Sequence, residues 1–277
     1  MQGNKNMEFT DCASLAKSVR LDCLRMVYEG RSGHIGSMLS CADLLAVLYK
    51  KILKVDPASP KAEERDRLIF SKGHGGAALF ATLAELGFFP KDWLWTYYKD
   101  GGKLSGHISH HVPGVEFSTG SLGHGLPVAC GMALYAKNSG KNHRIFCVVS
   151  DGDLDEGSTW EAIMLAAQHK FNNLCMIVDY NRLQALGRSE DIIDLEELDE
   201  KLNQFRWNTT VVQDGHDYAQ IYDALKDFPH PDKPQAVICH TIKGKNVSFM
   251  ENDYRWHYGP ITEELYKKAV AEVEAGK

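Results

Sequence analysis

Two polar segments of the sequence follow short apolar runs and carry oxygen-bearing side chains that suit a hard metal ion. Asp151 follows the apolar run Ile145–Val149, and Asn181 follows the run Leu174–Val178, with one amphipathic stretch between them. If both runs are strands of one parallel sheet, their carboxyl ends meet at the sheet edge where such folds bind ligands. A carboxylate, an amide oxygen and a backbone carbonyl such as that of Leu183 form a ligand set that Mg²⁺ or Ca²⁺ accepts.

The residues beside Asp151 also suit an anion. Gly152 has no side chain that would exclude a phosphate, and a helix expected to begin near Gly157 would direct its N-terminal amides toward that anion. A diphosphate held through the metal is therefore the expected ligand. The alternative is that the Ser-Asp-Gly-Asp segment is only a turn, because Asp and Gly are favoured in turns.

The apolar pattern alternates between short continuous runs and amphipathic stretches, after two N-terminal stretches with helical spacing. This alternation predicts an α/β fold with a doubly wound, mostly parallel sheet and helices on both faces. No linker or internal repeat divides the chain, so we expect a single domain over residues 1–277 with an N-terminal helical extension. The expected strands are Arg67–Phe70, Ile145–Val149, Leu174–Val178, Trp207–Val212 and Ala236–His240, and the expected helices are Cys12–Tyr28, Cys41–Leu53 with Ser40 as its N-cap, Ala77–Leu86, Thr159–His169, Leu195–Phe205 and Tyr218–Phe228.

Composition excludes several classes of protein. The 37 acidic and 31 basic residues give a formal net charge of -6 without a block of one sign, so nucleic acid is not an expected partner. No stretch approaches the ~20 apolar residues of a membrane span, and the first ten residues lack the apolar core of a signal peptide. The seven cysteines contain no CxxC pair, which is typical of a reduced protein. We therefore expect a cytoplasmic protein without membrane contact.

An Asp-Gly after one strand and an Asn after the next strand resemble the thiamine diphosphate motif, GDG followed at a distance by Asn. Ser150 stands where that motif has its first glycine, a change that concerns backbone freedom rather than a ligand. Four further blocks resemble transketolases in the same order along the chain: Arg31–Tyr49, Arg67–Phe89, Pro113–Lys137 and His240–Gly259. The chain is thus similar over nearly its whole length to the N-terminal, diphosphate-binding section of transketolases.

This resemblance implies roles for individual residues and a fold of the thiamine diphosphate-binding, diphosphate (PP) type. The metal would be held by Asp151, Asn181 and the Leu183 carbonyl; the cofactor would be bound by His74, Gly120, Ser121, Leu122, Gly152, Asp153, Asn181 and His257; the sugar would face the catalytic residues His34, His107 and His257; and Glu156 would lie at a subunit interface.

The resemblance implies transfer of a two-carbon ketol unit from a ketose to an aldose, with phosphorylated sugars as the expected substrates. Hydroxyl protons move at each step, and histidine, with an ordinary pKa near ~6.5, can donate or accept them at neutral pH. His34, His74 and His107 each follow a glycine, which favours close approach of a ligand. A zinc site built from His107, His110 and His111 is an alternative, although no HExxH motif or cysteine pair accompanies these residues.

The resemblance also implies a partner chain. Transketolases activate the cofactor with a glutamate from a second α/β domain, and this sequence stops at Lys277, shortly after its last transketolase-like block. We therefore expect a C-terminal transketolase subunit that carries the pyrimidine-binding domain, with two copies of each chain in a heterotetramer.

Other interpretations of the sequence account for fewer of its features. The glycines of Gly120–Gly125 read GxxGxG rather than the nicotinamide dinucleotide fingerprint, and no serine hydrolase elbow occurs. The α subunit of a 2-oxo acid dehydrogenase shares the metal motif but not the other blocks. Two alternatives stay open: a non-catalytic cofactor-binding subunit, and a ketol or acyl transferase of specialised sugar or surface-polysaccharide biosynthesis.

Overall fold

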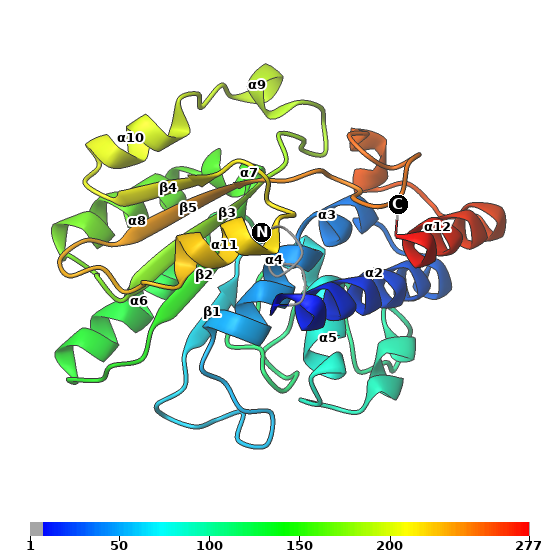
Figure 1. Cartoon of the computed structure of the whole chain (residues 1–277), viewed down its shortest axis with the longest axis horizontal. Coiled ribbons are helices and arrows are strands. Elements are labelled where there is room, and N and C mark those ends of the chain that lie inside the picture. The colour runs from blue at the N-terminus through cyan, green and yellow to red at the C-terminus, as the bar shows by residue number, and fades with distance from the viewer. Residues whose placement is uncertain (1–7, 277) are drawn as a thin grey trace.

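The computed structural model describes residues 8–276 and is built around a parallel five-stranded sheet (Figure 1). The strand order is β1-β2-β3-β5-β4, and the neighbours in this order pair in parallel. The strands are β1 Arg67–Phe70, β2 Ile145–Ser150, β3 Leu174–Tyr180, β4 Asn208–Val212 and β5 Gln235–His240. The predicted parallel α/β sheet is confirmed.

Alternate residues of each strand pack into hydrophobic cores on opposite faces of the sheet. In β2, Phe146 and Val148 pack into the core on one face. Cys147 and Val149 pack into the core on the other face. Because both faces are covered, every residue of β2 and β3 is buried, which explains why these strands are continuous apolar runs in the sequence.

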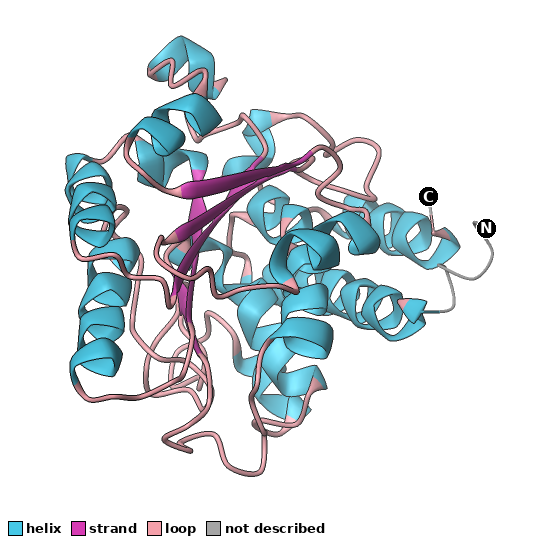
Figure 2. Cartoon of the chain, turned by 60° about the vertical axis from the view of Figure 1, so that its left-hand side comes forward, coloured by secondary structure: helices cyan, strands magenta, loops and turns pink. Residues whose placement is uncertain are grey.

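Helices cover both faces of the sheet (Figure 2). The helices α6, α8 and α10 pack on the face of Cys147, whereas α2, α4, α5 and α11 pack on the other face, with α12 against α2. The α-helices are α2 Thr10–Gly30, α3 Ile35–Ser40, α4 Ala42–Val47, α5 Gly76–Glu85, α6 Gly125–Asn138, α7 Asp151–Leu154, α8 Gly157–Gln168, α9 Ser189–Ile192, α10 Leu198–Gln204, α11 Tyr218–Leu225 and α12 Glu263–Ala275; η1 Leu48–Ile52 is a π-helix, and η2 Gly73–Gly75, η3 Lys91–Thr96 and η4 Tyr254–His257 are 3-10 helices.

The N-terminal helices differ from the prediction at Ser40. The segment expected as one helix consists of α4 and η1, and Ser40 ends the preceding helix α3 instead of capping α4. Its hydroxyl donates a hydrogen bond of 2.7 Å to the carboxylate of Asp179, at the end of β3. Ser40 therefore belongs to a buried polar network.

The other predicted strands and helices are present, with ends displaced by a few residues. One displacement matters for the site, because β3 continues to Tyr180 and Asn181 therefore follows it directly. Residues 1–7, on which the expected absence of a signal peptide partly depends, lie outside the described residues. None of the helices in residues 8–276 combines the length and apolar character needed to cross a lipid bilayer.

Candidate cofactor and substrate site

A cavity of about 230 Å³ opens where the loops that follow β1, β2, β3 and β5 come together. Its wall is formed by the carboxyl-end loops of the parallel strands, as the position of Asp151 and Asn181 in the sequence predicts. The lining residues are His34, Ser37, Lys72, His74, His107, Gly120, Leu122, Ser150, Asp151, Gly152, Asn181, Leu183, Gln184, Ala185, Lys243 and His257.

The three predicted metal ligands lie together in the wall of this cavity. The Asp151 carboxylate accepts hydrogen bonds from the backbone N–H groups of Asn181 and Arg182, at 3.3 and 3.1 Å. The Asn181 amide oxygen accepts one from the backbone N–H of Leu183, at 3.1 Å. A carboxylate, an amide oxygen and a carbonyl therefore come from two adjacent strand ends, which is a donor set that fits Mg²⁺ or Ca²⁺.

The Asp151 carboxyl group is suited to a cation because it is buried without a cationic side chain bonded to it. It is only 3% exposed, and burial, followed by the charge of Asp179, raises its pKa to about 7. A divalent ion would offset the free-energy cost of an ionised carboxylate in this position.

The turn after β2, which was predicted to face a diphosphate, differs from the prediction in the helix that begins there. The helix that begins at the cavity is the short α7, which starts at Asp151, and not α8, which starts at Gly157 outside the cavity lining. Ser150 and Asp153 form the capping box of α7. A Cβ atom on Gly152 would lie 3.0 Å from Leu122 Cδ1, so glycine also serves the packing of the cavity wall.

Four histidines from distant parts of the sequence meet in the cavity. The ring centroid of His34 lies 5.4 Å from that of His74, 5.8 Å from that of His107 and 5.0 Å from that of His257. The rings of His74 and His257 are 5.3 Å apart. The structure thus brings together all four histidines to which the resemblance assigned roles.

Burial keeps the inner three imidazoles neutral. Burial, and then His107, lowers the pKa of His34 to about 4, while burial, and then Lys243, lowers the pKa of His257 to about 3. Burial also holds the pKa of His74 well below its ordinary value. A neutral imidazole carries one donor and one acceptor nitrogen, so each ring can share protons with hydroxyl groups near pH 7.

One unpredicted lysine lies at the inner side of the cavity. Lys72 is fully buried, forms an ion pair with the equally buried Asp179, and donates a hydrogen bond of 3.0 Å to the Ser37 carbonyl. Lys72 follows β1, so the strand-end rule that located Asp151 could have found it.

A second unpredicted lysine joins the metal ligands to the histidines. Lys243, 1% exposed, donates a hydrogen bond of 2.9 Å to the Leu183 carbonyl, and its Nζ lies 3.1 Å from His257 Nδ1. Burial, and then the charge of Lys72, lowers the pKa of Lys243 to about 8. A buried ammonium without a bonded carboxylate is suited to binding an anion. The sequence feature that could have identified Lys243 is its position shortly after the strand β5.

The loop that carries this second lysine is held on two sides by buried carboxylates. Thr241 donates a hydrogen bond to Asp179. The next residue, Ile242, donates its backbone N–H to His216 Nε2 at 2.8 Å, and His216 Nδ1 lies 2.7 Å from Asp43 Oδ2. This pattern requires a neutral His216 with its proton on Nδ1, and it fixes the loop against the strand ends.

Two residues assigned to the cofactor do not line the cavity. Asp153 is fully buried and accepts hydrogen bonds from Ser71 Oγ at 2.6 Å, from the Gly123 N–H at 3.0 Å and from Ser150. Both of its carboxylate oxygens are therefore occupied by hydrogen bonds within the protein. Ser121 is exposed beside the lining residues.

Glu156, which the resemblance assigns to a subunit interface, lies on the surface of the chain. It is exposed, and its side chain packs over Gly123, where a Cβ atom would lie 2.6 Å from the Glu156 Cβ. Gly123 also has a φ of +76°, so a larger residue there is disfavoured on both counts.

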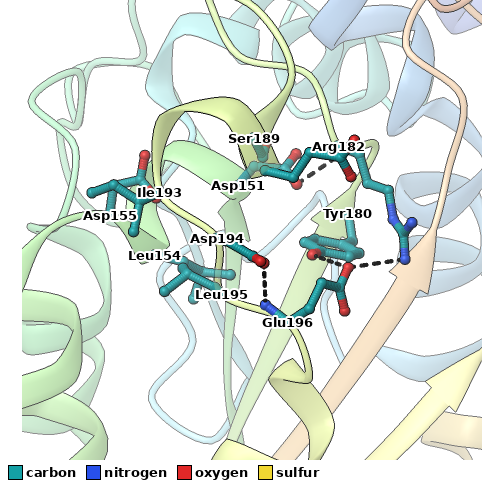
Figure 3. A pocket seen from close by; sticks show the side chains of 11 residues that line it. Asp151, Leu154, Asp155, Tyr180, Arg182, Ser189, Ile193, Asp194, Leu195 and Glu196 are labelled. Atoms are coloured by element: carbon teal, nitrogen blue, oxygen red, sulfur yellow. Dashed lines mark hydrogen bonds and ion pairs between the residues drawn. The ribbon is translucent and has the colours of Figure 1, made fainter.

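Asp151 also borders a second cavity of about 10 Å³, shown in Figure 3. There the Tyr180 hydroxyl donates a hydrogen bond of 2.9 Å to Glu196, which also pairs with Arg182 at 3.0 Å. The Glu196 N–H donates to Asp194 at 2.9 Å. The space suffices for about one water molecule, so these residues fix the loop after β3 and leave the larger cavity as the ligand site.

The zinc alternative finds no support. His107 faces His34, whereas His110 and His111 stack on each other with centroids 4.1 Å apart. Nowhere in residues 8–276 do three or more His, Cys, Asp or Glu side chains form a group that could hold a metal ion. The candidate metal site at Asp151 therefore depends on one carboxylate together with neutral oxygens.

Comparison with known families assigns the chain. Residues 12–273 match the family described as transketolase, thiamine diphosphate binding domain. The chain belongs to the transketolase family. It is 41% identical over 255 residues to an apulose-4-phosphate transketolase subunit of Actinobacillus succinogenes, covering 91% of this chain and 92% of that protein. It is 40% identical over 244 residues to a 6-deoxy-6-sulfo-D-fructose transketolase subunit of a Clostridium species, covering 87% and 88%.

Solved transketolases share this fold. The structure superposes on transketolase from Campylobacter jejuni with a TM-score of 0.89 at 32% identity, covering 95% of this chain and 42% of that one. Human transketolase is 32% identical over 262 residues, which are 93% of this chain and 41% of the human protein. This transketolase-family chain therefore spans about two fifths of these larger enzymes, and nearly all of the relatives described as subunits.

Proposed function

We propose that this transketolase-family chain is the N-terminal subunit of a split transketolase, which binds thiamine diphosphate through a divalent metal and transfers a two-carbon ketol unit from a ketose to an aldose. The observation that carries the proposal is the cavity itself. It combines the hard oxygens of Asp151, Asn181 and Leu183 with four histidines in one continuous wall.

The residues present fit the cofactor. Asp151, Asn181 and the Leu183 carbonyl would hold Mg²⁺ or Ca²⁺, and the anionic diphosphate would lie against Gly152 and the Lys243 ammonium. The set proposed to contact the remainder of the cofactor comprises His74, Gly120, Leu122 and His257, with Ser121 beside it. When bound, thiamine diphosphate supplies the electron sink for breaking and forming the C–C bond.

The histidines would handle the protons of the sugar hydroxyls. His34 and His257 are neutral near pH 7 and their ring centroids lie 5.0 Å apart, so each carries one nitrogen that can donate a hydrogen bond to a sugar hydroxyl and one that can accept a hydrogen bond from it. His107 is exposed, with its ring centroid 5.8 Å from that of His34, and would serve as a proton-transfer group for a sugar hydroxyl.

The substrates and the partner are proposals as well. The relatives named for apulose 4-phosphate and for a sulfofructose favour a specialised sugar over general pentose exchange. Their description as subunits supports a second chain, which we propose to be the C-terminal, pyrimidine-binding subunit of a heterotetramer. All seven cysteines are free and buried, which supports a reducing, cytoplasmic location.

The experiment that tests this function uses the chain coexpressed with a C-terminal transketolase subunit from the same organism. We expect thiamine diphosphate and Mg²⁺ to be required for release of an aldose from a ketose donor, with the two-carbon unit recovered on an aldose acceptor. Saturable cofactor binding without ketol transfer from any donor would instead assign the chain to the alternative, a non-catalytic cofactor-binding subunit.

Replacement of His107 by alanine is expected to lower kcat by about 10²–10⁴-fold, because a positioned proton-transfer group is lost. Thiamine diphosphate affinity should stay unchanged, since the His107 ring lies beside His34 and outside the metal ligands. Steady-state kinetics and cofactor titration of the complex measure both quantities. His111→Ala is the matched control, and a kcat of His107→Ala within twofold of the parent would contradict the role.

Replacement of Lys243 by methionine is expected to weaken thiamine diphosphate binding by about tenfold or more, which corresponds to about 1.4 kcal/mol or more. The change removes a buried ammonium beside Leu183 while keeping most of the side-chain volume. Calorimetric titration of the complex measures the affinity. Lys245→Met, which alters a neighbouring lysine paired with Glu251, is the control, and equal affinities in parent and Lys243→Met would remove Lys243 from the diphosphate site.

A further inference from the structure

The glycines before the site histidines make room for protein side chains and not for a ligand. A Cβ atom on Gly73, which precedes His74, would lie 2.5 Å from the Thr119 carbonyl carbon. The other two glycines, Gly33 and Gly106, each precede a substrate-facing histidine in a Ser-Gly-His tripeptide. Protein atoms therefore adjoin each of these glycines, and the identity of the neighbouring groups is informative.

Each Ser-Gly-His tripeptide holds a tyrosine ring against its glycine. A Cβ atom on Gly33 would lie 2.6 Å from Tyr258 Cδ2, and a Cβ atom on Gly106 would lie 2.4 Å from Tyr98 Cε2. Only glycine therefore leaves space for these two rings beside the histidines. Tyr98 itself has a φ of +57°, an uncommon conformation for a bulky residue, which shows that its position is set by its surroundings.

The two tyrosines also contact each other and the histidine cluster. A hydrogen bond between the phenol groups of Tyr98 and Tyr258 raises the pKa of Tyr258. The Tyr258 ring lies edge-on to His34 with centroids 5.1 Å apart, and His34 lies 5.8 Å from His107. The pair thus continues the wall of the cavity outward from its two substrate-facing histidines.

These rings remain accessible although they pack tightly against the glycines. Tyr98 is 50% exposed and Tyr258 is 65% exposed. An exposed aromatic surface next to a polar cavity is suited to a ligand that is both hydroxylated and rich in C–H groups, because the ring face packs on C–H groups and the phenol exchanges hydrogen bonds.

The direction of the cavity decides which part of a sugar would reach the pair. Its lining includes the fully buried Lys72, which pairs with the equally buried Asp179, and the exposed His107, so the cavity opens on the His107 side, and its proposed reacting centre lies at the histidines. A ketose whose first carbons react there must extend outward past His34 and His107. The pair offers ring faces and hydroxyl groups but no cationic group, so it suits the carbon chain of the sugar more than a terminal phosphate or sulfonate.

We propose that Tyr98 and Tyr258 form the wall on which the carbon chain of the sugar packs beyond its third carbon, and that this pair sets the preference for longer sugars. The inference rests on the proposed ketol transfer. In this role the two tyrosines determine which length of sugar chain is preferred, whereas the histidines act on the reacting atoms.

The test compares two donors in the complex of this chain with its partner: the best ketose of five or more carbons found in a donor screen, and the three-carbon donor hydroxypyruvate, with one common acceptor. Tyr258→Ala and Tyr98→Ala should each lower kcat/KM for the longer donor by about tenfold or more, mainly through KM. Turnover of hydroxypyruvate should stay within about twofold, because this donor does not reach the rings.

Two further variants distinguish packing on the Tyr258 ring from effects of its hydroxyl group and of the surrounding segment. Tyr258→Phe keeps the ring and should retain most of the preference, so a loss as large as in Tyr258→Ala would overturn packing on the ring. Tyr254→Ala removes another exposed tyrosine of the same segment, at 45% exposure, and should behave as the parent.

Failure of this inference and failure of the proposed function give different results. No turnover of either donor by the parent complex contradicts the ketol transfer itself. Active complexes in which the alanine variants lose both donors equally, or neither, overturn the specificity role. Light scattering of each complex completes the test, because loss of assembly in Tyr98→Ala or Tyr258→Ala would assign the pair to the partner interface and overturn the inference.

Discussion

Asp151→Asn is expected to raise the stability of the ligand-free chain and to abolish its stabilisation by divalent metal and thiamine diphosphate. The Asp151 carboxyl group is buried beside the charge of Asp179, so its ionised form is costly in the folded chain when no metal is present. An amide removes this cost and also removes the negative charge that the metal requires.

The sign of the pH dependence follows from the direction of the pKa shift. The folded chain holds the Asp151 proton with a pKa of about 7, against an ordinary value of 3.8, so it binds this proton more tightly than the unfolded chain. The contribution of Asp151 therefore makes the ligand-free chain less stable as pH rises from about 4 to about 7, by on the order of 2 to 4 kcal/mol. After the loss of one hydrogen-bond acceptor, at about 1 kcal/mol, Asp151→Asn should be about 1 to 3 kcal/mol more stable than the parent at pH 8.

Urea unfolding at pH 5 and pH 8, with and without Mg²⁺ and thiamine diphosphate, measures these effects. Asp66→Asn is the matched control, because Asp66 is also buried but pairs with Arg144 at 2.6 Å. Removing one partner of that pair should lower stability, which is the opposite sign. If Asp151→Asn were less stable than the parent at pH 8, or still gained stability from the metal and cofactor, the metal assignment would be wrong.

The sheet and the proximity of Asp151 to Asn181 were predictable because they depend on local patterns. Continuous apolar runs identified β2 and β3, and residues directly after strands must lie at one sheet edge, which placed Asp151 near Asn181. The same logic applies to Lys72 and Lys243. Their burial, however, depends on how the loops assemble, and a lysine after a strand is usually solvated.

Other features depend on contacts between segments far apart in the chain. Ser40 is a residue type typical of helix N-caps, and it stands directly before a stretch with helical spacing. Its hydroxyl nevertheless donates a hydrogen bond to Asp179, 139 residues later in the chain. Gly33 precedes a histidine as a glycine that admits a ligand would, yet it accommodates the ring of Tyr258, near the other end of the chain. A local pattern cannot distinguish these cases, because the competing partner is brought in by the fold and not by the sequence spacing.

The 277-residue chain by itself, saturated with Mg²⁺ and thiamine diphosphate, is expected to show at most about 10⁻² of the turnover of its complex with the C-terminal partner. Among the described residues that line the cavity, Asp151 is the only carboxylate, and it is assigned to the metal. The resemblance to transketolases requires a glutamate that hydrogen-bonds the aminopyrimidine ring of the cofactor. Loss of such a proton-transfer group costs about 10²–10⁴-fold in rate.

The surface of the chain supports a partner that supplies this glutamate. Helices α6 and α8, which lie side by side on one face of the sheet, expose Leu134 and Tyr135 on α6 and Met164 and Leu165 on α8, at 37%, 58%, 50% and 45% exposure. Exposed apolar side chains of this size on two adjacent helices favour an interaction surface there. Glu156, at the start of α8, lies on the same helix pair.

Assembly and turnover should therefore fail together. Leu165→Asp places a charge on the exposed face of α8 and should prevent formation of the complex, whereas Ile192→Asp, on α9, is a control of similar exposure that should leave it intact. Turnover should appear only in the chromatographic fraction that contains both chains, because Asp151 is the one carboxylate that residues 8–276 contribute to the cavity wall. Robust ketol transfer by the purified 277-residue chain would show that the activating group lies within it, and would overturn the two-chain enzyme.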